Sequence, residues 1–424
     1  MSFEKYASFS LVFTPLLSSY FFPNTTTVLE TVFLFVNCII FAYHNKAKHI
    51  VWPKYYRLFF AYALFVPILG WFYYRDISTA ISSYITIILY TACFIQYIPL
   101  LNFEDVKRYY KYIVVIACAF FILQEIMFTL LGWRISAILP FLPIRYDYTT
   151  TSDFIQAQMI APRSQSLFLE PAHFAQYLLG YLAILLGDSC NKKQLINIPA
   201  IMLSLVLLLT WSGNAIVLTF ILWISFFFFI KLKPVVKYVI ILPVMIIFVV
   251  QAFGIVSSTE KGSKLLDRTE ELDGEQDKIS SGAMRIYRGF IVYSNMTLSQ
   301  QVTGVGSGVT IDVIDNSPVN WMFYDSEYYL NNVQTLLIGY GLIGTVVFLF
   351  FLLFLGRSNN YIAKFFIILF IGLSFIESLW GSARMLLYLS IPFLIYKNYL
   401  IEKYEKSNAC FRNSTGSDKN GTSC

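Results

Sequence analysis

Two side chains that can exchange protons stand close together in an otherwise apolar stretch. Glu170 is followed by Pro171, and His173 comes just before a long apolar run. A carboxylate or a neutral imidazole can accept a proton from a hydroxyl group. Because proline disfavours helical geometry at the residue before it and suits the first turn of a helix, a helix is expected to begin at Pro171. The alternative roles are structural: an interfacial hydrogen bond for His173, and orientation of Arg163 by Glu170.

Further acidic candidates lie later in the chain. Glu327 precedes the apolar run that starts at Tyr328, and it is a third candidate base. Glu377 lies seven residues before Arg384. For Glu377, a simple ion pair with Arg384 is the favoured interpretation.

Four arginines are candidates to bind phosphate groups. The planar guanidinium forms paired hydrogen bonds to phosphate and stays charged in a low-dielectric setting. The alternative is anchoring to lipid headgroups, a role that lysine fills nearly as well. The candidates are Arg163, Arg285, Arg288 and Arg384.

The elements that position these residues are expected to be membrane-spanning helices. Of 424 residues, 57% are hydrophobic and only 13% are charged, and the mean hydropathy is +0.62. This composition excludes a soluble enzyme, a secreted disulfide scaffold and a disordered protein. A bilayer crossing needs roughly 20 apolar residues, and the chain offers about twelve such runs: 7–22, 27–43, 58–74, 77–101, 111–133, 166–187, 195–211, 213–230, 238–256, 328–355, 365–380 and 384–400. Pro15 and Pro67 are expected to break the first and the third of these spans.

The positive charges predict how these spans are oriented. With both termini in the cytoplasm, the cytoplasmic segments hold 20 of the 31 lysines and arginines, and 16 of those 20 are lysine. The outer segments hold the other 11, of which eight are arginine. The excess of cations follows the positive-inside rule, whereas the preference for arginine outside is not needed for topology.

The chain reads as a single transmembrane domain, 1–424, with two enlarged outer loops, 134–165 and 257–327. The second loop is too long for a structureless connection, and an amphipathic helix is expected over about 281–297. This helix would lie along the membrane surface, with Arg285 and Arg288 facing headgroups or a cavity. Gly304 to Gly308 reads as a flexible turn, and the polar tail 401–424 as a disordered cytoplasmic segment.

Four segments, taken in order, resemble the bacterial O-antigen polymerases (Wzy) and, more distantly, the O-antigen ligases. Asn214 is a departure from the family pattern: it stands where an arginine or other polar residue is often found. No histidine occurs near 320–332, where ligases usually have one, and this favours polymerase. The segments are Arg163 with Phe168-Leu169-Glu170-Pro171, Trp211-Ser212-Gly213-Asn214-Ala215, Arg285 with Gly304-Val305-Gly306-Ser307-Gly308, and Asp325-Ser326-Glu327 with Tyr340-Gly341-Leu342-Ile343-Gly344.

The resemblance implies an all-α polytopic fold in the polymerase and ligase branch of the GT-C glycosyltransferases. It implies an inner-membrane enzyme with a periplasmic site that joins an undecaprenyl-diphosphate-linked oligosaccharide to another lipid-linked repeat unit. Arg163, Arg285, Arg288 and Arg384 would bind the diphosphate, and Glu170, His173 or Glu327 would be the base. No cofactor, metal or nucleic acid is expected, and the implied partners are the lipid-linked donor and acceptor, membrane lipid and a chain-length regulator.

Two other functions are consistent with the same sequence. One is a ligase or another polymerase of lipid-linked glycans. The other is a twelve-span transporter or flippase, which would be expected to show two related halves and charged or broken helices near the midplane. The candidate charges instead lie at the outer ends of the spans.

Overall fold

The computed structural model describes residues 2–23, 27–45, 54–71, 77–144, 151–161, 163–230, 281–306, 310–318 and 330–416. In this part of the chain every regular element is a helix, and extended pairing is limited to isolated bridges between Tyr20 and Ile144 and between Phe21 and Val28. The described residues form fifteen α-helices and one 3-10 helix: α1 (Phe3–Phe13), η1 (Thr14–Ser19), α2 (Leu29–His44), α3 (Lys54–Trp71), α4 (Ile77–Tyr97), α5 (Phe103–Leu131), α6 (Thr151–Ile160), α7 (Pro171–Lys192), α8 (Ile198–Leu209), α9 (Gly213–Phe229), α12 (Ser281–Asn295), α13 (Leu298–Thr303), α14 (Thr310–Asp315), α15 (Asn332–Leu355), α16 (Tyr361–Ser374) and α17 (Ala383–Gly416).

Two of the described helices are long and apolar enough to cross a membrane, α5 with 29 residues and α15 with 24. Helices α2, α8, α9 and α16 are shorter and also apolar. An apolar outward face is what a helix in contact with lipid requires. Because every regular element in the described part of the chain is a helix, the expected all-α fold is confirmed there. The twelve spans stay a prediction. The exposed side chains of α5 include Val115, Ile116, Ile122, Leu123, Ile126 and Leu130.

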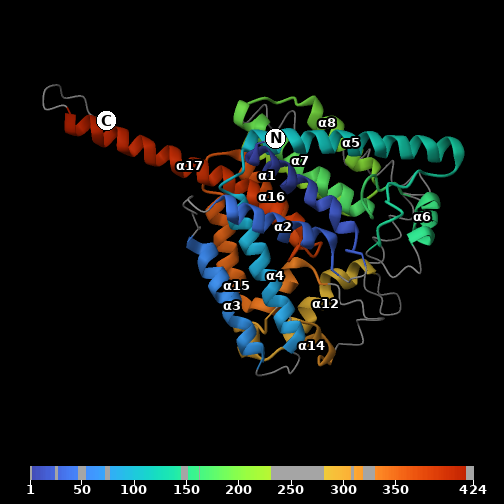
Figure 1. Cartoon of the computed structure of the whole chain (residues 1–424), viewed down its shortest axis with the longest axis horizontal. Helices are drawn as coiled ribbons and strands as arrows, with labels where there is room; N and C mark the ends of the chain where they lie inside the picture. Colours follow the sequence, from blue (N-terminus) through green and yellow to red (C-terminus); the bar gives the residue numbers. More distant parts are fainter. Residues whose placement is uncertain are drawn as a thin grey trace.

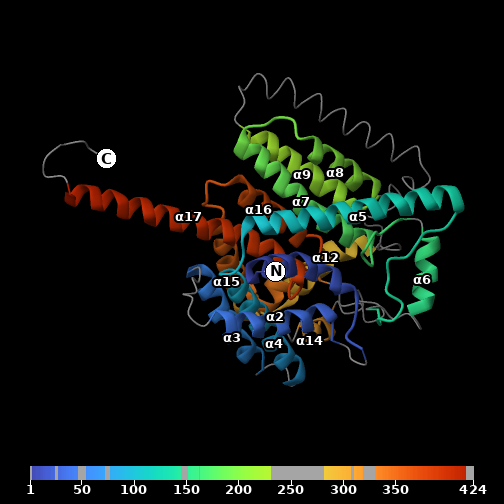
Figure 2. The same ribbon diagram turned by 45° about the horizontal axis from the view of Figure 1, so that its top comes forward.

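Helix α7 lies at the centre of the bundle. It packs against α5, α8, α9 and α16, and every residue from Phe174 to Ile184 is buried. Figure 1 and Figure 2 show α7, α8 and α9 grouped beside α5, with α3, α4 and α15 in a second group and α17 extending away from both. A polar side chain in the buried part of α7 must find its hydrogen bonds within the protein.

One break agrees with the sequence-based expectation, and two elements differ from it. At Pro15 the first expected span changes from α1 to the 3-10 helix η1, which fits the predicted break. Helix α3, in contrast, is continuous through Pro67. Helix α17 runs to Gly416, so most of the expected disordered tail is helical. The expected span 238–256 lies outside the described residues.

The described parts of the two expected outer loops each pack on the bundle through a small apolar core. In the first loop, Ile138, Ile144 and Phe154 pack with Tyr20 and Leu169. In the second loop, residues of α12 and α14 and the segment after α13 pack on the start of α15. This second core contains Val292, Met296, Val305, Val313, Ile314, Leu330 and Ile338.

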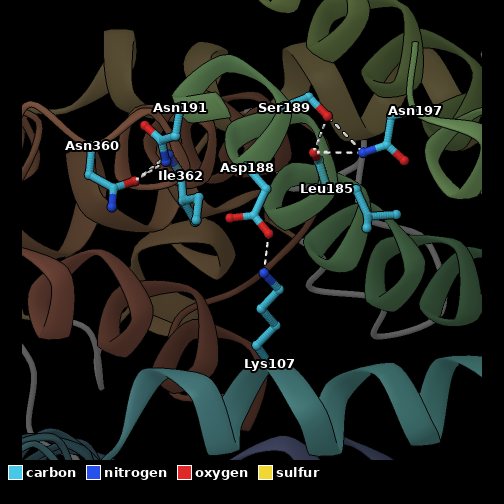
Figure 3. A network of polar contacts seen from close by, with 8 residues as sticks. All are labelled: Lys107, Leu185, Asp188, Ser189, Asn191, Asn197, Asn360 and Ile362. Carbon is cyan, nitrogen blue, oxygen red and sulfur yellow. Dashed lines mark hydrogen bonds and ion pairs between the residues drawn. The ribbon is translucent and has the colours of Figure 1, made fainter. Parts of the chain in front are cut away.

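One end of the bundle gathers segments that the sequence assigns to the cytoplasm. Lys107 of α5 forms an ion pair with Asp188 of α7, and the Asn191 side chain donates to Asn360 over 3.0 Å (Figure 3). We refer to this as the inner end, and to the opposite end, where α7, α15 and α17 begin, as the outer end. The contacts at the inner end join three expected cytoplasmic segments: 102–110, 188–194 and 356–364.

Candidate functional site

The outer end of α7 carries three of the expected site residues. Helix α7 begins at Pro171, as predicted, and Glu170 is its N-cap in extended geometry, with φ −131° and ψ 146°. Arg163, Glu170 and His173 are each half-buried. The break at Pro171 therefore keeps all three at the outer end rather than inside the apolar core.

A largely buried strap, residues 164–169, fixes the path of the chain between Arg163 and Glu170. Ser166 adopts left-handed backbone geometry, with φ 55°. Its N–H donates to Gln124 Oε1 over 2.9 Å, and its hydroxyl donates to the Ala117 carbonyl over 2.6 Å. Left-handed geometry costs a residue other than glycine about 1–3 kcal/mol, and these bonds to α5 offset that cost. The strap is therefore held in place by α5.

Arg134 is 2% exposed and holds the same strap. Its Nε donates to Ser164 Oγ over 2.7 Å, another guanidinium N–H donates to the Ala161 carbonyl, and Glu125 lies 3.3 Å away. The guanidinium carbon lies 3.6 Å from the centre of the Phe128 ring. Burial lowers the pKa of Arg134, and the neighbouring Glu125 carboxylate opposes this shift. Arg134 thus has internal partners on several sides and acts as a structural tether.

Arg163 reaches from the strap to the corner between α8 and α9. One guanidinium N–H donates to the Trp211 carbonyl over 3.3 Å. Trp211 has φ 52° and turns the chain into α9, which begins at Gly213. This contact joins the first two segments of the resemblance, which lie 48 residues apart in the chain.

Helix α12 carries Arg285 and Arg288 and matches the expected helix in position. Arg288 is 6% exposed, whereas Tyr287 is 58% exposed. A methyl group at Gly289 would come within 2.5 Å of the Gln334 side chain on α15, so the two helices touch there. Of the two expected surroundings of Arg288, headgroups and a cavity, its burial excludes the headgroups, because α12 turns this face toward the polar start of α15. The Arg285 side chain lies outside the described part of the structure.

The segment from Gly304 to Gly306 is docked on α15 and is not the flexible turn that the sequence suggested. The N–H groups of Val305 and Gly306 donate to the carbonyls of Ile338 and Gly339 over 3.2 and 2.7 Å. At Gly341, α15 leaves helical geometry, with φ 62° and ψ −173°. The kink presents the carbonyls that the docked segment needs, and it brings together the third and fourth segments of the resemblance.

Glycine is required on both sides of this contact. Gly304 has φ 80°, and a methyl group there would lie 2.5 Å from the Gly341 backbone nitrogen. A methyl group at Gly341 would lie 2.4 Å from the Gly304 nitrogen. The Tyr62 hydroxyl of α3 donates to the Thr303 carbonyl over 2.6 Å, so three elements meet at the kink.

A second polar group, the Glu377 cluster, lies where α7, α15, α16 and α17 meet: Gln176, Asn332, Glu377 and Arg384. The Gln176 side chain is fully buried, donates to Glu377 Oε2 over 3.0 Å and accepts a bond from Arg384. The Asn332 N–H donates to the backbone carbonyl of Glu377 over 2.9 Å. The expected direct ion pair is therefore wrong, because between these two described residues the Gln176 side chain joins the carboxylate to the guanidinium.

Sequence reasoning missed Gln176 and Asn332. The available signal was an amide side chain inside an apolar helical run, since a polar residue in a span is costly unless it has a structural or functional role. Glu327, the third candidate base, lies outside the described residues. The described contacts therefore assign Arg163 to the α8–α9 corner, Arg288 to the α12–α15 contact and Arg384 to the Glu377 cluster.

Comparison with known proteins assigns this chain to no family. No protein family model matches it, and no curated protein matches it either. The chemistry of the site therefore has to be argued from the residues themselves.

Both ends of the bundle hold cations and carboxylates, but at the inner end they include direct ion pairs, Lys107–Asp188 and Arg108–Asp105. A cavity of about 350 Å³ at the inner end is bounded by Phe103, Asn191, Asn360, Tyr399 and Glu402, among others. None of the described residues that line it is a lysine or an arginine. A phosphorylated ligand is therefore better matched at the outer end, where half-buried or buried guanidinium groups lie close to carboxylates.

Proposed function

We propose that this chain is an inner-membrane O-antigen polymerase, a metal-independent glycosyltransferase of the GT-C type with about twelve spans and both termini in the cytoplasm. One observation carries the proposal: segments of the resemblance that are far apart in sequence pair in space. Arg163 contacts Trp211, and Gly304 to Gly306 dock on the kink at Gly341. Such pairing, of the first segment with the second and of the third with the fourth, supports a shared role for the segments rather than four chance matches.

The proposed reaction transfers an oligosaccharide from undecaprenyl diphosphate to a hydroxyl group of another lipid-linked repeat unit. The diphosphate leaves with its negative charge, which fixed guanidinium groups stabilise in a low-dielectric setting. Arg163, Arg285, Arg288 and Arg384 are the proposed diphosphate ligands. Glu170, His173 and Glu327 are the proposed bases, and a chain-length regulator is a proposed partner.

The kink in α15 is the observation that favours the second candidate, a transporter. Broken helices in transporters expose backbone carbonyls that coordinate ions. Here, however, the carbonyls of Ile338 and Gly339 accept bonds from Val305 and Gly306. Because these carbonyls already accept hydrogen bonds from the protein, they are not free to coordinate an ion. The kink therefore gives the transporter little support.

The test is the surface polysaccharide of a strain from which the gene for this chain has been deleted. A polymerase predicts lipopolysaccharide capped with a single repeat unit, and return of the long-chain ladder when the gene is restored. Loss of every repeat unit would indicate a ligase or a flippase instead. An unchanged ladder would overturn the proposed function.

A further inference from the structure

The Glu377 cluster contains polar atoms that have no partner within the described structure. Gln176 occupies only one carboxylate oxygen of Glu377, Oε2, and one guanidinium nitrogen of Arg384. Arg384 Nε and Asn332 Oδ1 are buried without a hydrogen bond. An unsatisfied buried polar group costs about 1–3 kcal/mol, so two in one cluster indicate a polar ligand that would satisfy them.

The cluster is arranged to hold a carboxylate without neutralising it. In a two-pronged arginine–carboxylate pair both oxygens are occupied. The Gln176 amide instead fixes Glu377 through one oxygen, and the Asn332 N–H fixes the backbone of the same residue. The side chain of Glu377 is 7% exposed and sits at the outer end, where α16 has ended and α17 has not yet begun.

We propose that Glu377 is the proton acceptor of glycosyl transfer and that Gln176 is the residue that positions it. Glu377 then takes the role of base in place of Glu170, His173 and Glu327. This inference rests on the proposed function. The hydroxyl oxygen of the acceptor sugar forms a bond to the anomeric carbon of the donor, and its proton passes to Glu377. The bond between that carbon and the diphosphate oxygen breaks, and the electron pair leaves with undecaprenyl diphosphate beside Arg384.

Glu377→Gln separates a chemical role from a structural one. The new amide oxygen still accepts the bond from Gln176, so the fold and the melting temperature should be retained. General base catalysis contributes about 10²–10⁴-fold in rate, so long-chain polymer in the complemented deletion strain should fall at least about 100-fold. Thermal stabilisation of the purified chain by undecaprenyl diphosphate should be unchanged, because the arginines remain. A wild-type ladder from Glu377→Gln would overturn the inference.

The double variant Gln176→Glu with Glu377→Gln keeps the charge and the hydrogen bonds of the cluster. Its carboxylate at 176 accepts from Arg384, and its amide at 377 donates to that carboxylate. We expect no polymer, because the carboxylate has moved away from position 377. If the ladder returns, the cluster needs only its charge balance and the base assignment is wrong. If the single variant Glu377→Gln fails to accumulate in the membrane, this double variant still tests whether Glu377 is the base.

The control and the parent hypothesis are tested in the same strains. Asp188→Asn changes a carboxylate at the inner end, and its ladder should be like that of the wild type at matched membrane levels. If deletion of the gene leaves the ladder intact, the proposed function fails. If deletion removes the ladder and Glu377→Gln restores it fully, only the present inference fails.

Discussion

At the residue scale, arginines that look alike in the sequence have different surroundings. Arg134 is bonded to Ser164, Ala161 and Glu125 and is buried as a tether. Arg163 is half-buried and contacts a backbone carbonyl at the α8–α9 corner. Arg288 lies inside the protein on α12. Loss of a structural arginine should lower the stability of the protein, whereas loss of an arginine that binds the diphosphate should lower the rate of transfer.

We therefore expect Arg163→Lys and Arg288→Lys to abolish most polymer while the protein stays folded. Lysine keeps the charge but loses paired hydrogen bonding, and removal of one preorganised donor costs about 10²–10³ in rate. The measurement is the polysaccharide ladder of the complemented deletion strain, at matched membrane levels. Arg134→Ala is the contrasting variant: it should destabilise the chain by about 3 kcal/mol, because it leaves buried partners unpaired. Normal ladders from both lysine variants would show that neither residue needs paired hydrogen bonding to the diphosphate.

At the element scale, the kink in α15 and the docked segment 304–306 depend on each other. The kink exposes the carbonyls of Ile338 and Gly339, and the docked segment supplies their donors. We expect neither half to be stable alone, because buried backbone groups without hydrogen-bond partners are costly. The docked segment follows α13, and both α12 and α13 pack against α15.

Alanine at Gly304 or Gly341 should destabilise the protein and reduce polymer together. Each methyl group would meet backbone atoms within 2.5 Å, and left-handed geometry adds about 1–3 kcal/mol for a residue with a side chain. Gly132→Ala should lower the stability only by the cost of left-handed geometry, since φ is 75° but no atom lies within 4 Å of the added methyl group. Gly213→Ala, with open space and no positive φ, should be close to neutral. Melting temperatures of the purified variants give the order, and equal values for all four would contradict the docked contact.

At the scale of the whole molecule, polar contacts separate into two ends of the bundle. The inner end holds the Lys107–Asp188 ion pair and the Asn191–Asn360 bond. The outer end holds Arg163, Arg288 and the Glu377 cluster. Helix α7 connects the two ends, so its length separates the proposed chemistry from the expected cytoplasmic face.

This arrangement predicts opposite locations for reporters attached at the two ends. Fusions at Ser152 and Asp273 should report the periplasm, and fusions at Lys192 and Lys233 should report the cytoplasm. A pair of reporters with one active only outside the inner membrane and one active only inside provides the measurement. Reversed signals at either pair would overturn the twelve-span topology, and with it the grouping of Arg163 with Arg285.

The sequence alone determined the features that depend on local chemistry. Apolar composition predicted an all-helical fold, because every backbone group in lipid must be bonded within its own segment. The restriction that proline imposes on its neighbour predicted where α7 begins. The continuity of α3 through Pro67 was not predictable in the same way, because surrounding helices can stabilise a helix that contains proline.

Only the tertiary structure decided which polar groups meet. Gln176 contacts Glu377 and Arg384 across 201 and 208 residues of chain, and no local pattern records such a distance. The orientation of Arg288 likewise depends on the polar start of α15, and the geometry of Gly304 depends on the kink at Gly341. Partners of this kind are chosen by helix packing, because a buried polar group must be satisfied by whatever donor or acceptor the fold brings to it.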